Sequence, residues 1–183
     1  MTAPHAFVLL DDARAKGASD ARLFPKPQAL FIARRPEEVA PALAAADAAL
    51  TAQGGALAGY IAYEAGLALE PRLAGLAAAR TGADGPLVWL GLFATHETIP
   101  AAQMPQWLAA RAGGDRAPAV GPLEPQVTPG QYAGMFDAIH EAITAGDIYQ
   151  ANLTFPLTGS YRGDPLALYA AIRPAAAAGY GGV

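Results

Sequence analysis

Four short apolar runs in the first half of the chain predict buried strands. They cover residues 7–10, 29–33, 57–63 and 87–94. The first run ends at Asp11 and the second at Arg34, whereas the other two are rich in aromatic and β-branched residues and follow glycine-containing turns. Short apolar runs with such boundaries are typical of strands.

Other segments have the spacing of helices. From Pro36 to about Leu50, apolar residues recur every three or four positions behind two glutamates, which favour the positive end of a helix dipole. Residues 65–80 have a helical composition with weak periodicity. Asp164 followed by Pro165 predicts the start of a last helix.

The helix with the most complete signals is predicted between residues 128 and 146. Thr128 is placed as its N-cap, Gln131 as the capping-box partner three residues later, and Gly146 as its end. One face of this helix is apolar and consists of Tyr132, Phe136, Ile139 and Ile143.

Residues 148–155 alternate between apolar and polar side chains, which predicts a half-buried strand. The apolar positions are Tyr149, Ala151, Leu153 and Phe155; the polar positions are Gln150, Asn152 and Thr154, and the acidic Asp147 precedes them. Taken alone, the polar row is explained by solvent exposure or by cross-strand hydrogen bonds.

Together these elements predict an α+β fold with a mixed, largely antiparallel sheet and flanking helices. Proline and glycine are dense between residues 111 and 130, which indicates a surface crossing or linker. We therefore place a boundary there, with one region at residues 1–127 and a second at residues 128–183.

Composition narrows the possible functions. The chain has 183 residues, a net charge of −4 and no cysteine, so disulfides, thiolate nucleophiles and cysteine-ligated zinc are excluded. Its basic residues are scattered and form no stripe, so nucleic acid is not expected as a partner. No segment has the length and apolar character of a membrane span, and the N-terminus lacks the basic flank of a signal peptide, so we expect a cytoplasmic protein.

Common catalytic motifs are missing from the sequence. The three histidines are far apart and no metal site is predicted from them; His140 is expected on a solvated helix face near Asp137. Neither lysine lies in a glycine-rich turn, which excludes a P-loop, and neither serine lies in a nucleophile elbow. A hydrolase triad is therefore not available in this chain.

A resemblance to a known family suggests a function for the polar residues between 147 and 154. Residues 146–154, Gly-Asp-Ile-Tyr-Gln-Ala-Asn-Leu-Thr, resemble the G-D-x-Y-Q-x-N-L-T signature that opens the chorismate-binding domain of the chorismate-utilising enzymes. These enzymes are component I of aminodeoxychorismate synthase and of anthranilate synthase. The Gly-Asp-Pro-x-x-Leu-Tyr run at residues 163–169 matches the family as well, and residues 7–14 and 59–66 are similar to N-terminal segments of the aminodeoxychorismate type.

Spacing favours the aminodeoxychorismate type over anthranilate synthase. Only 127 residues precede Thr128, fewer than is usual in anthranilate synthase, and the Leu-Leu-Glu-Ser element of that enzyme stands here as Leu-Leu-Asp-Asp at residues 9–12. The resemblance implies the N-terminal part of an anthranilate synthase component I-like fold, with residues 128–183 as the start of an incomplete chorismate-binding domain.

The resemblance also implies the chemistry of a parent enzyme, in which an amine replaces the 4-hydroxyl of chorismate on the way to 4-aminobenzoate and folate. In that family, the glutamates that hold Mg²⁺ and the lysine that attacks the ring lie beyond the position of Val183. Ammonia comes from a glutamine amidotransferase subunit. The resemblance therefore implies no catalytic residue in this chain, and we expect the chain alone to be inactive and to bind no Mg²⁺.

Family members hold tryptophan or a related effector between the Leu-Leu-x-x segment and a Pro-Tyr element. The matching positions here are Leu9, Leu10, Asp11 and Asp12 with Tyr180. Gly179 replaces the family proline and Asp12 the serine, so a purely structural strand contact is the alternative reading of these residues.

Two further expectations concern function and self-association. The alternative function is a non-catalytic binding or scaffold module of the same fold. The apolar face of residues 148–155 is expected to stay uncovered, so the chain is predicted to self-associate through this strand.

Overall fold

The computed structural model describes residues 6–77, 85–113 and 117–183. The chain forms two compact units. One unit consists of Met1–Trp107 with Ile172–Val183, and the other of Leu108–Ala171. The boundary that the sequence predicts between residues 127 and 128 stays a prediction.

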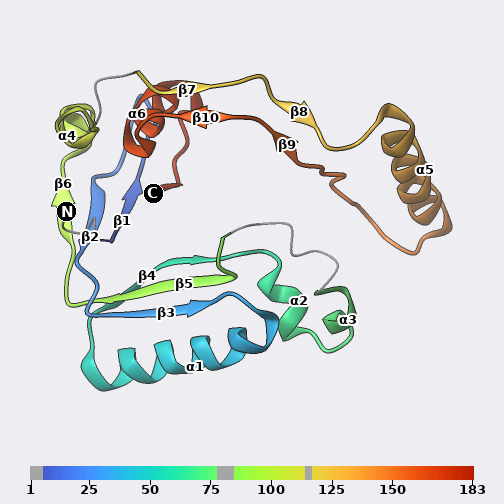
Figure 1. The fold of residues 1–183 in the computed structure, drawn as a ribbon, viewed down its shortest axis with the longest axis horizontal. Helices are drawn as coiled ribbons and strands as arrows, with labels where there is room; N and C mark the ends of the chain where they lie inside the picture. The colour runs from blue at the N-terminus through green and yellow to red at the C-terminus, as the bar shows by residue number, and fades with distance from the viewer. Residues whose placement is uncertain (1–5, 78–84, 114–116) are drawn as a thin grey trace. The chain divides into compact units, whose positions relative to one another are not determined.

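A four-stranded antiparallel sheet in the first unit pairs the first strand of the chain with the last (Figure 1). Its strands, in spatial order, are β11 (Gly181–Gly182), β1 (Phe7–Asp11), β2 (Ala21–Pro25) and β6 (Glu97–Ile99). The backbone N–H of Leu9 donates to the carbonyl of Val183 at 2.8 Å, and the N–H of Val183 donates back at 2.9 Å. The C-terminal segment is therefore a strand beside β1.

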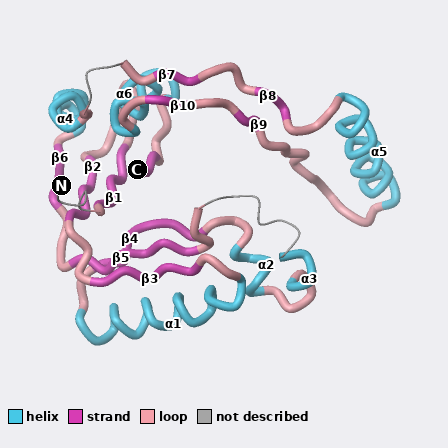
Figure 2. Tube along the Cα trace, in the orientation of Figure 1, coloured by secondary structure: helices cyan, strands magenta, loops and turns pink. Residues whose placement is uncertain are grey.

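A three-stranded antiparallel sheet forms the rest of this unit, with α1 along one face (Figure 2). Its strands, in order, are β3 (Ala29–Ala33), β5 (Val88–Phe93) and β4 (Ala56–Ile61), and the helix α1 spans Pro36–Gln53. Glu38 accepts hydrogen bonds from the backbone N–H groups of Arg34 and Arg35, at 2.8 and 3.1 Å. These bonds fix the first turn of α1, and Gly54 follows its last turn.

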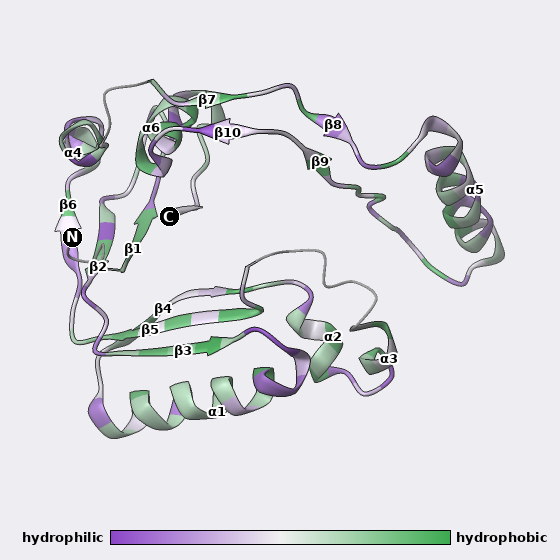
Figure 3. Cartoon of the chain, in the orientation of Figure 1, coloured by the Kyte–Doolittle hydropathy of each residue, from purple (hydrophilic) through white to green (hydrophobic). Residues whose placement is uncertain are grey.

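Two buried clusters hold the first unit together. Between the sheets, Phe24 of β2 contacts Phe93 of β5 with ring centroids 5.6 Å apart, and Val8 and Ala58 complete this cluster. The second cluster lies under the helices and contains Ala33, Val39, Ala65, Leu87 and Val88. Most of β3 and α1 is coloured hydrophobic in Figure 3, as burial against these clusters requires.

Short helices complete the first unit and lead into the second. They are α2 (Ala65–Leu69), α3 (Ala74–Ala77), the 3₁₀ turn η1 (Ala101–Gln103) and α4 (Met104–Arg111). The helical segment predicted at residues 65–80 is thus two short helices, and its residues 78–80 lie outside the described part of the chain.

The second unit contains two strand pairs and a long helix. The pairs are β7 (Ala119–Val120) with β10 (Tyr161–Arg162), and β8 (Glu124–Pro125) with β9 (Leu157–Thr158). The helix α5 spans Pro129–Ala145, with the predicted capping box and with Gly146 at φ 79°. A last helix, α6 (Pro165–Ala176), begins in this unit and ends in the first.

The predicted α+β class and the largely antiparallel pairing are confirmed. The strand predicted at residues 148–155 is wrong, since no ladder forms until β9 at Leu157. A strand needs a neighbour for its backbone N–H and C=O groups, and the described residues supply none here. Among the described residues, no helix has the length and apolar character needed to cross a bilayer.

Candidate functional site

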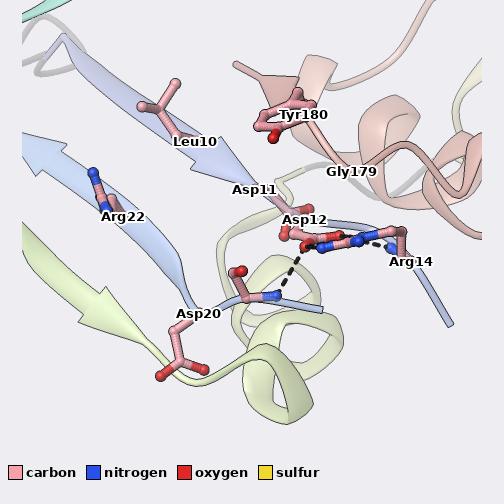
Figure 4. Close-up of a pocket in the computed structure, with 10 residues that line it drawn as sticks. Leu10, Asp11, Asp12, Arg14, Asp20, Arg22, Gly179 and Tyr180 are labelled. Atoms are coloured by element: carbon pink, nitrogen blue, oxygen red, sulfur yellow. Dashed lines mark hydrogen bonds and ion pairs between the residues drawn. The ribbon is translucent and has the colours of Figure 1, made fainter. Parts of the chain in front are cut away.

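A pocket of about 390 Å³ lies where the C-terminal segment meets β1 and β2 (Figure 4). Most of the residues that line it are charged residues or glycines. They are Leu10, Asp11, Asp12, Arg14, Ser19, Asp20, Arg22, Gly179, Tyr180 and Gly181. Four of the five residues predicted for an effector pocket, Leu10, Asp11, Asp12 and Tyr180, are brought together here.

Strand register explains which residues reach the pocket. Leu10 is paired with Arg22 on β2 and with Gly182 on β11, so these three residues form one row across the sheet. Leu9, the fifth predicted residue, does not line the pocket. It is fully buried in the core.

Both carboxylate oxygens of Asp12 accept hydrogen bonds. The Arg14 side chain donates from Nε at 2.9 Å and from Nη2 at 2.6 Å, and its backbone N–H donates at 3.1 Å. The backbone N–H of Ser19 donates at 2.8 Å. These bonds, above all those from the Arg14 side chain, hold the pKa of Asp12 far below its usual range and raise the pKa of Arg14.

The neighbouring Asp11 binds α6 instead. Its carboxylate accepts hydrogen bonds from Nε and Nη2 of Arg173, at 2.6 and 3.0 Å, in a bidentate pair. Arg173 also donates to the backbone carbonyl of Asp12 at 3.0 Å. The two side chains are 1% and 13% exposed, so the pair is nearly dry. The two aspartates at the end of β1 thus bind different arginines: Asp11 binds Arg173 of α6, and Asp12 binds Arg14.

Gly179 lies at the rim of the pocket, next to the side chain of Arg14. A Cβ atom there would lie 3.3 Å from Nε of Arg14, closer than most side-chain contacts. The N–H of Ala13 donates to the carbonyl of Ala178 at 2.8 Å, which holds this segment against β1. Tyr180, the next residue, is fully exposed at the pocket edge. Glycine at position 179 therefore leaves room for the Arg14 side chain.

The signature residues Asp147, Tyr149, Gln150, Asn152 and Thr154 lie in the second unit and are all exposed. The N–H of Asp147 donates to the carbonyl of Ala142 at 2.9 Å and so helps to end α5. Tyr149 is 94% exposed. His140 is also exposed and stacks on Phe136 one turn away.

The acidic side chains that the structure describes do not fit a magnesium site. Among those that the structure describes, no three His, Cys, Asp or Glu side chains gather in a way that could hold a metal ion. The two pocket carboxylates closest in sequence, Asp11 and Asp12, each bind an arginine, which occupies the oxygens that Mg²⁺ would need. We therefore assign no metal ligand among the residues that the structure describes.

A comparison with known protein families tests the resemblance that the sequence suggests. The profile described as chorismate binding enzyme matches residues 5–182, nearly the whole chain. The chain belongs to the chorismate binding enzyme family. No curated protein and no solved structure matches it. The resemblance read from residues 146–154 is thus confirmed at the level of the chorismate-binding family.

Sequence reasoning gave no role to Arg14, Arg22 or Arg173. Arg14 stands two residues after Asp12, a spacing that allows a local ion pair, so it could have been singled out. Arg173 lies 162 residues from its partner Asp11, and no local signal connects the two. Arg22 enters the pocket only through the register of β1 and β2.

Proposed function

We propose that this chain is part of component I of an aminodeoxychorismate synthase that works in the cytoplasm. The observation that carries the proposal is the nine-residue signature at residues 146–154 inside a family match that covers residues 5–182. The short region before Thr128 and the Leu-Leu-Asp-Asp run at residues 9–12 favour this type over anthranilate synthase.

In this proposal the residues of the chain support the catalytic site and do not perform the reaction. The parent enzyme replaces the 4-hydroxyl of chorismate by an amine, with ammonia from a glutamine amidotransferase partner. Mg²⁺ in the parent enzyme would neutralise the substrate carboxylate and favour loss of the hydroxyl. No step is assigned to a side chain of this chain, in keeping with the arginine-bound state of Asp11 and Asp12, two of the three aspartates that line the pocket.

We further propose that the pocket beside β1 binds a small regulatory ligand of the parent enzyme. The observation that favours this second role is the cavity of about 390 Å³ that Leu10, Asp11, Asp12 and Tyr180 line together. If these residues make only a structural contact, a substitution that fills the cavity should leave the response of the parent enzyme to small ligands unchanged.

Complementation tests the first proposal. A bacterial strain that lacks component I of aminodeoxychorismate synthase grows only with added 4-aminobenzoate. We expect the complete gene product to restore growth without it, and the 183-residue chain alone not to. Rescue of a tryptophan-requiring strain that lacks anthranilate synthase component I would instead support the alternative enzyme. Failure to rescue either strain would favour the scaffold module.

A further inference from the structure

The strand β3 lies at one edge of the three-stranded sheet (Figure 2). Its inner edge pairs with β5 from Ala29 to Ala33, and among the described residues no strand pairs with its outer edge. The strand contains no charged residue and no proline, which are common features of edge strands that resist pairing with another chain. The outer edge of β3 is therefore open to a further strand.

A groove of about 460 Å³ follows this outer edge. Three consecutive residues of β3 line it on one side, Leu30, Phe31 and Ile32, and the first turns of α1 line it on the other. Successive side chains of a strand point to opposite faces, so a groove that all three residues line runs along the edge of the strand, beside its backbone. The α1 side includes Pro41 and Ala42, whose short side chains leave room for another strand.

Large aliphatic side chains beside this groove are exposed. Leu30 is 44% exposed and Ile32 is 41% exposed. Both lie on the sheet face opposite to that of Ala33, which is buried in the cluster under the helices. A partner strand at this edge would cover apolar surface and pair with the free backbone N–H and C=O groups of β3.

The sequence of β3 is symmetric in size about Phe31. It is Ala-Leu-Phe-Ile-Ala over residues 29–33. In an antiparallel pair of two β3 strands centred on Phe31, Leu30 stands opposite Ile32, and Phe31 stands opposite its own copy. The outer alanines stand opposite each other as well. Every pair thus joins side chains of matched size, and large apolar pairs of this kind stabilise antiparallel sheets.

The charged residues next to β3 favour the same register. In the antiparallel pair, Arg34 of one copy stands opposite Gln28 of the other, and Arg35 opposite Pro27. No like charges therefore face each other. In a parallel pair in register, each arginine would stand beside its own copy. The antiparallel pair has a two-fold axis at Phe31, which gives a closed contact between identical surfaces.

We propose that the groove beside β3 is filled by the β3 strand of a second copy of this chain. The two strands pair antiparallel about Phe31 and join the two three-stranded sheets into one continuous sheet. This contact lies in the first unit and is separate from the exposed aromatic residues of the second unit. It does not depend on the activity of the parent enzyme.

Disulfide cross-linking tests the register, because the native chain has no cysteine. The variants Leu30→Cys and Ile32→Cys are mixed in equal amounts under reducing conditions and then oxidised, and mass spectrometry identifies the linked peptides. Opposite residues of antiparallel strands have Cα atoms about 4.5–5.5 Å apart, within disulfide range, whereas two copies of position 30 would be about 8 Å apart. We expect the disulfide between positions 30 and 32 to exceed either disulfide between like positions about tenfold or more.

A lysine at the edge tests the contact without a cross-link. Ile32→Lys places a charge opposite Leu30 of the second copy and should raise the dimer dissociation constant about tenfold or more, measured by sedimentation velocity. Ile61→Lys is the matched control and should leave this constant unchanged, since Ile61 is 51% exposed and lies on β4 at the other edge of the same sheet. Association through the second unit contributes equally to both variants.

Three results would overturn the proposal. Disulfides between like positions could form as readily as the mixed disulfide, Ile32→Lys could associate as Ile61→Lys does, or the native chain could stay monomeric at high concentration. Circular dichroism shows whether each variant keeps its fold. If Ile32→Lys does not fold, the cysteine variants decide the question, because both replace exposed side chains.

Discussion

Arg173 near the C-terminus holds Asp11 of the first strand through two hydrogen bonds of 2.6 and 3.0 Å. Because both side chains are largely buried, removing the Arg173 side chain leaves the charge of Asp11 without this ion pair. We expect Arg173→Leu to lower the free energy of unfolding by about 3–5 kcal/mol, measured by urea denaturation followed by circular dichroism.

A double variant separates the ion pair from simple packing. Asp11→Asn combined with Arg173→Leu also removes the buried negative charge that Arg173→Leu alone leaves behind. The double variant should therefore lose less stability than the two single variants lose in sum. Arg162→Leu, an exposed arginine on β10, is the control and should have little effect. Additive single effects would argue that the pair is not coupled.

The hydrogen bonds to the Asp12 carboxylate predict that the free energy of unfolding falls at low pH. Its pKa is lowered in the folded state, chiefly by the side chain of Arg14, so the stabilisation is present at neutral pH and is lost as the pH falls below about 4, the value of an unperturbed aspartate. The stability difference between the native chain and Asp12→Asn should therefore shrink from pH 6 to pH 2.

Arg14→Gln removes the largest cause of the lowered pKa and should reduce the acid dependence in the same way. Urea midpoints at several pH values give both comparisons. A stability difference for Asp12→Asn that is as large at pH 2 as at pH 6 would show that the carboxylate is not held as described.

The cap of α5 gives a third prediction. The Thr128 hydroxyl accepts from the N–H of Gln131 at 3.2 Å, and the Gln131 side chain accepts from the N–H of Thr128 at 2.8 Å. Thr128→Ala should destabilise α5 by about 0.5–2 kcal/mol, seen as faster amide hydrogen exchange in its first two turns. Thr128→Ser keeps the acceptor and should exchange as the native chain does.

Local signals explain which parts of the fold could be predicted. The ends of α5 follow from Thr128, Gln131 and Gly146, since capping depends on neighbours a few residues apart. The sequence also predicted β3 at its observed limits, because an apolar run between prolines and arginines is a local pattern.

Long-range pairing explains what could not be predicted. β11 consists of Gly181 and Gly182, which carry no strand signal and pair only because β1 offers an edge. Conversely, the alternation at residues 148–155 predicts a strand that lacks a partner in the described chain. The pocket residues were found by resemblance at β1 and Tyr180, whereas Arg22 required the strand register.

Exposed aromatic surface in the second unit predicts self-association. Phe136 on the apolar face of α5 is 52% exposed and Tyr149 is 94% exposed. Burying such surface against a second copy recovers about 25 cal/mol per Å². We expect light scattering after size-exclusion chromatography to show a mass that rises with concentration.

A double variant, Phe136→Ser with Tyr149→Ser, should shift this equilibrium toward the monomer. The matched control is Tyr63→Ser, because Tyr63 is also 94% exposed but lies in the first unit. A native chain that stays monomeric at high concentration would contradict the prediction.

Product analysis tests the proposed role in chorismate amination most directly. The 183-residue chain and the complete gene product are each incubated with chorismate, ammonia and Mg²⁺, and the products are identified by mass spectrometry. We predict 4-amino-4-deoxychorismate from the complete product and none above background from the chain alone. Anthranilate from the complete product, or amination by the chain alone, would contradict the account.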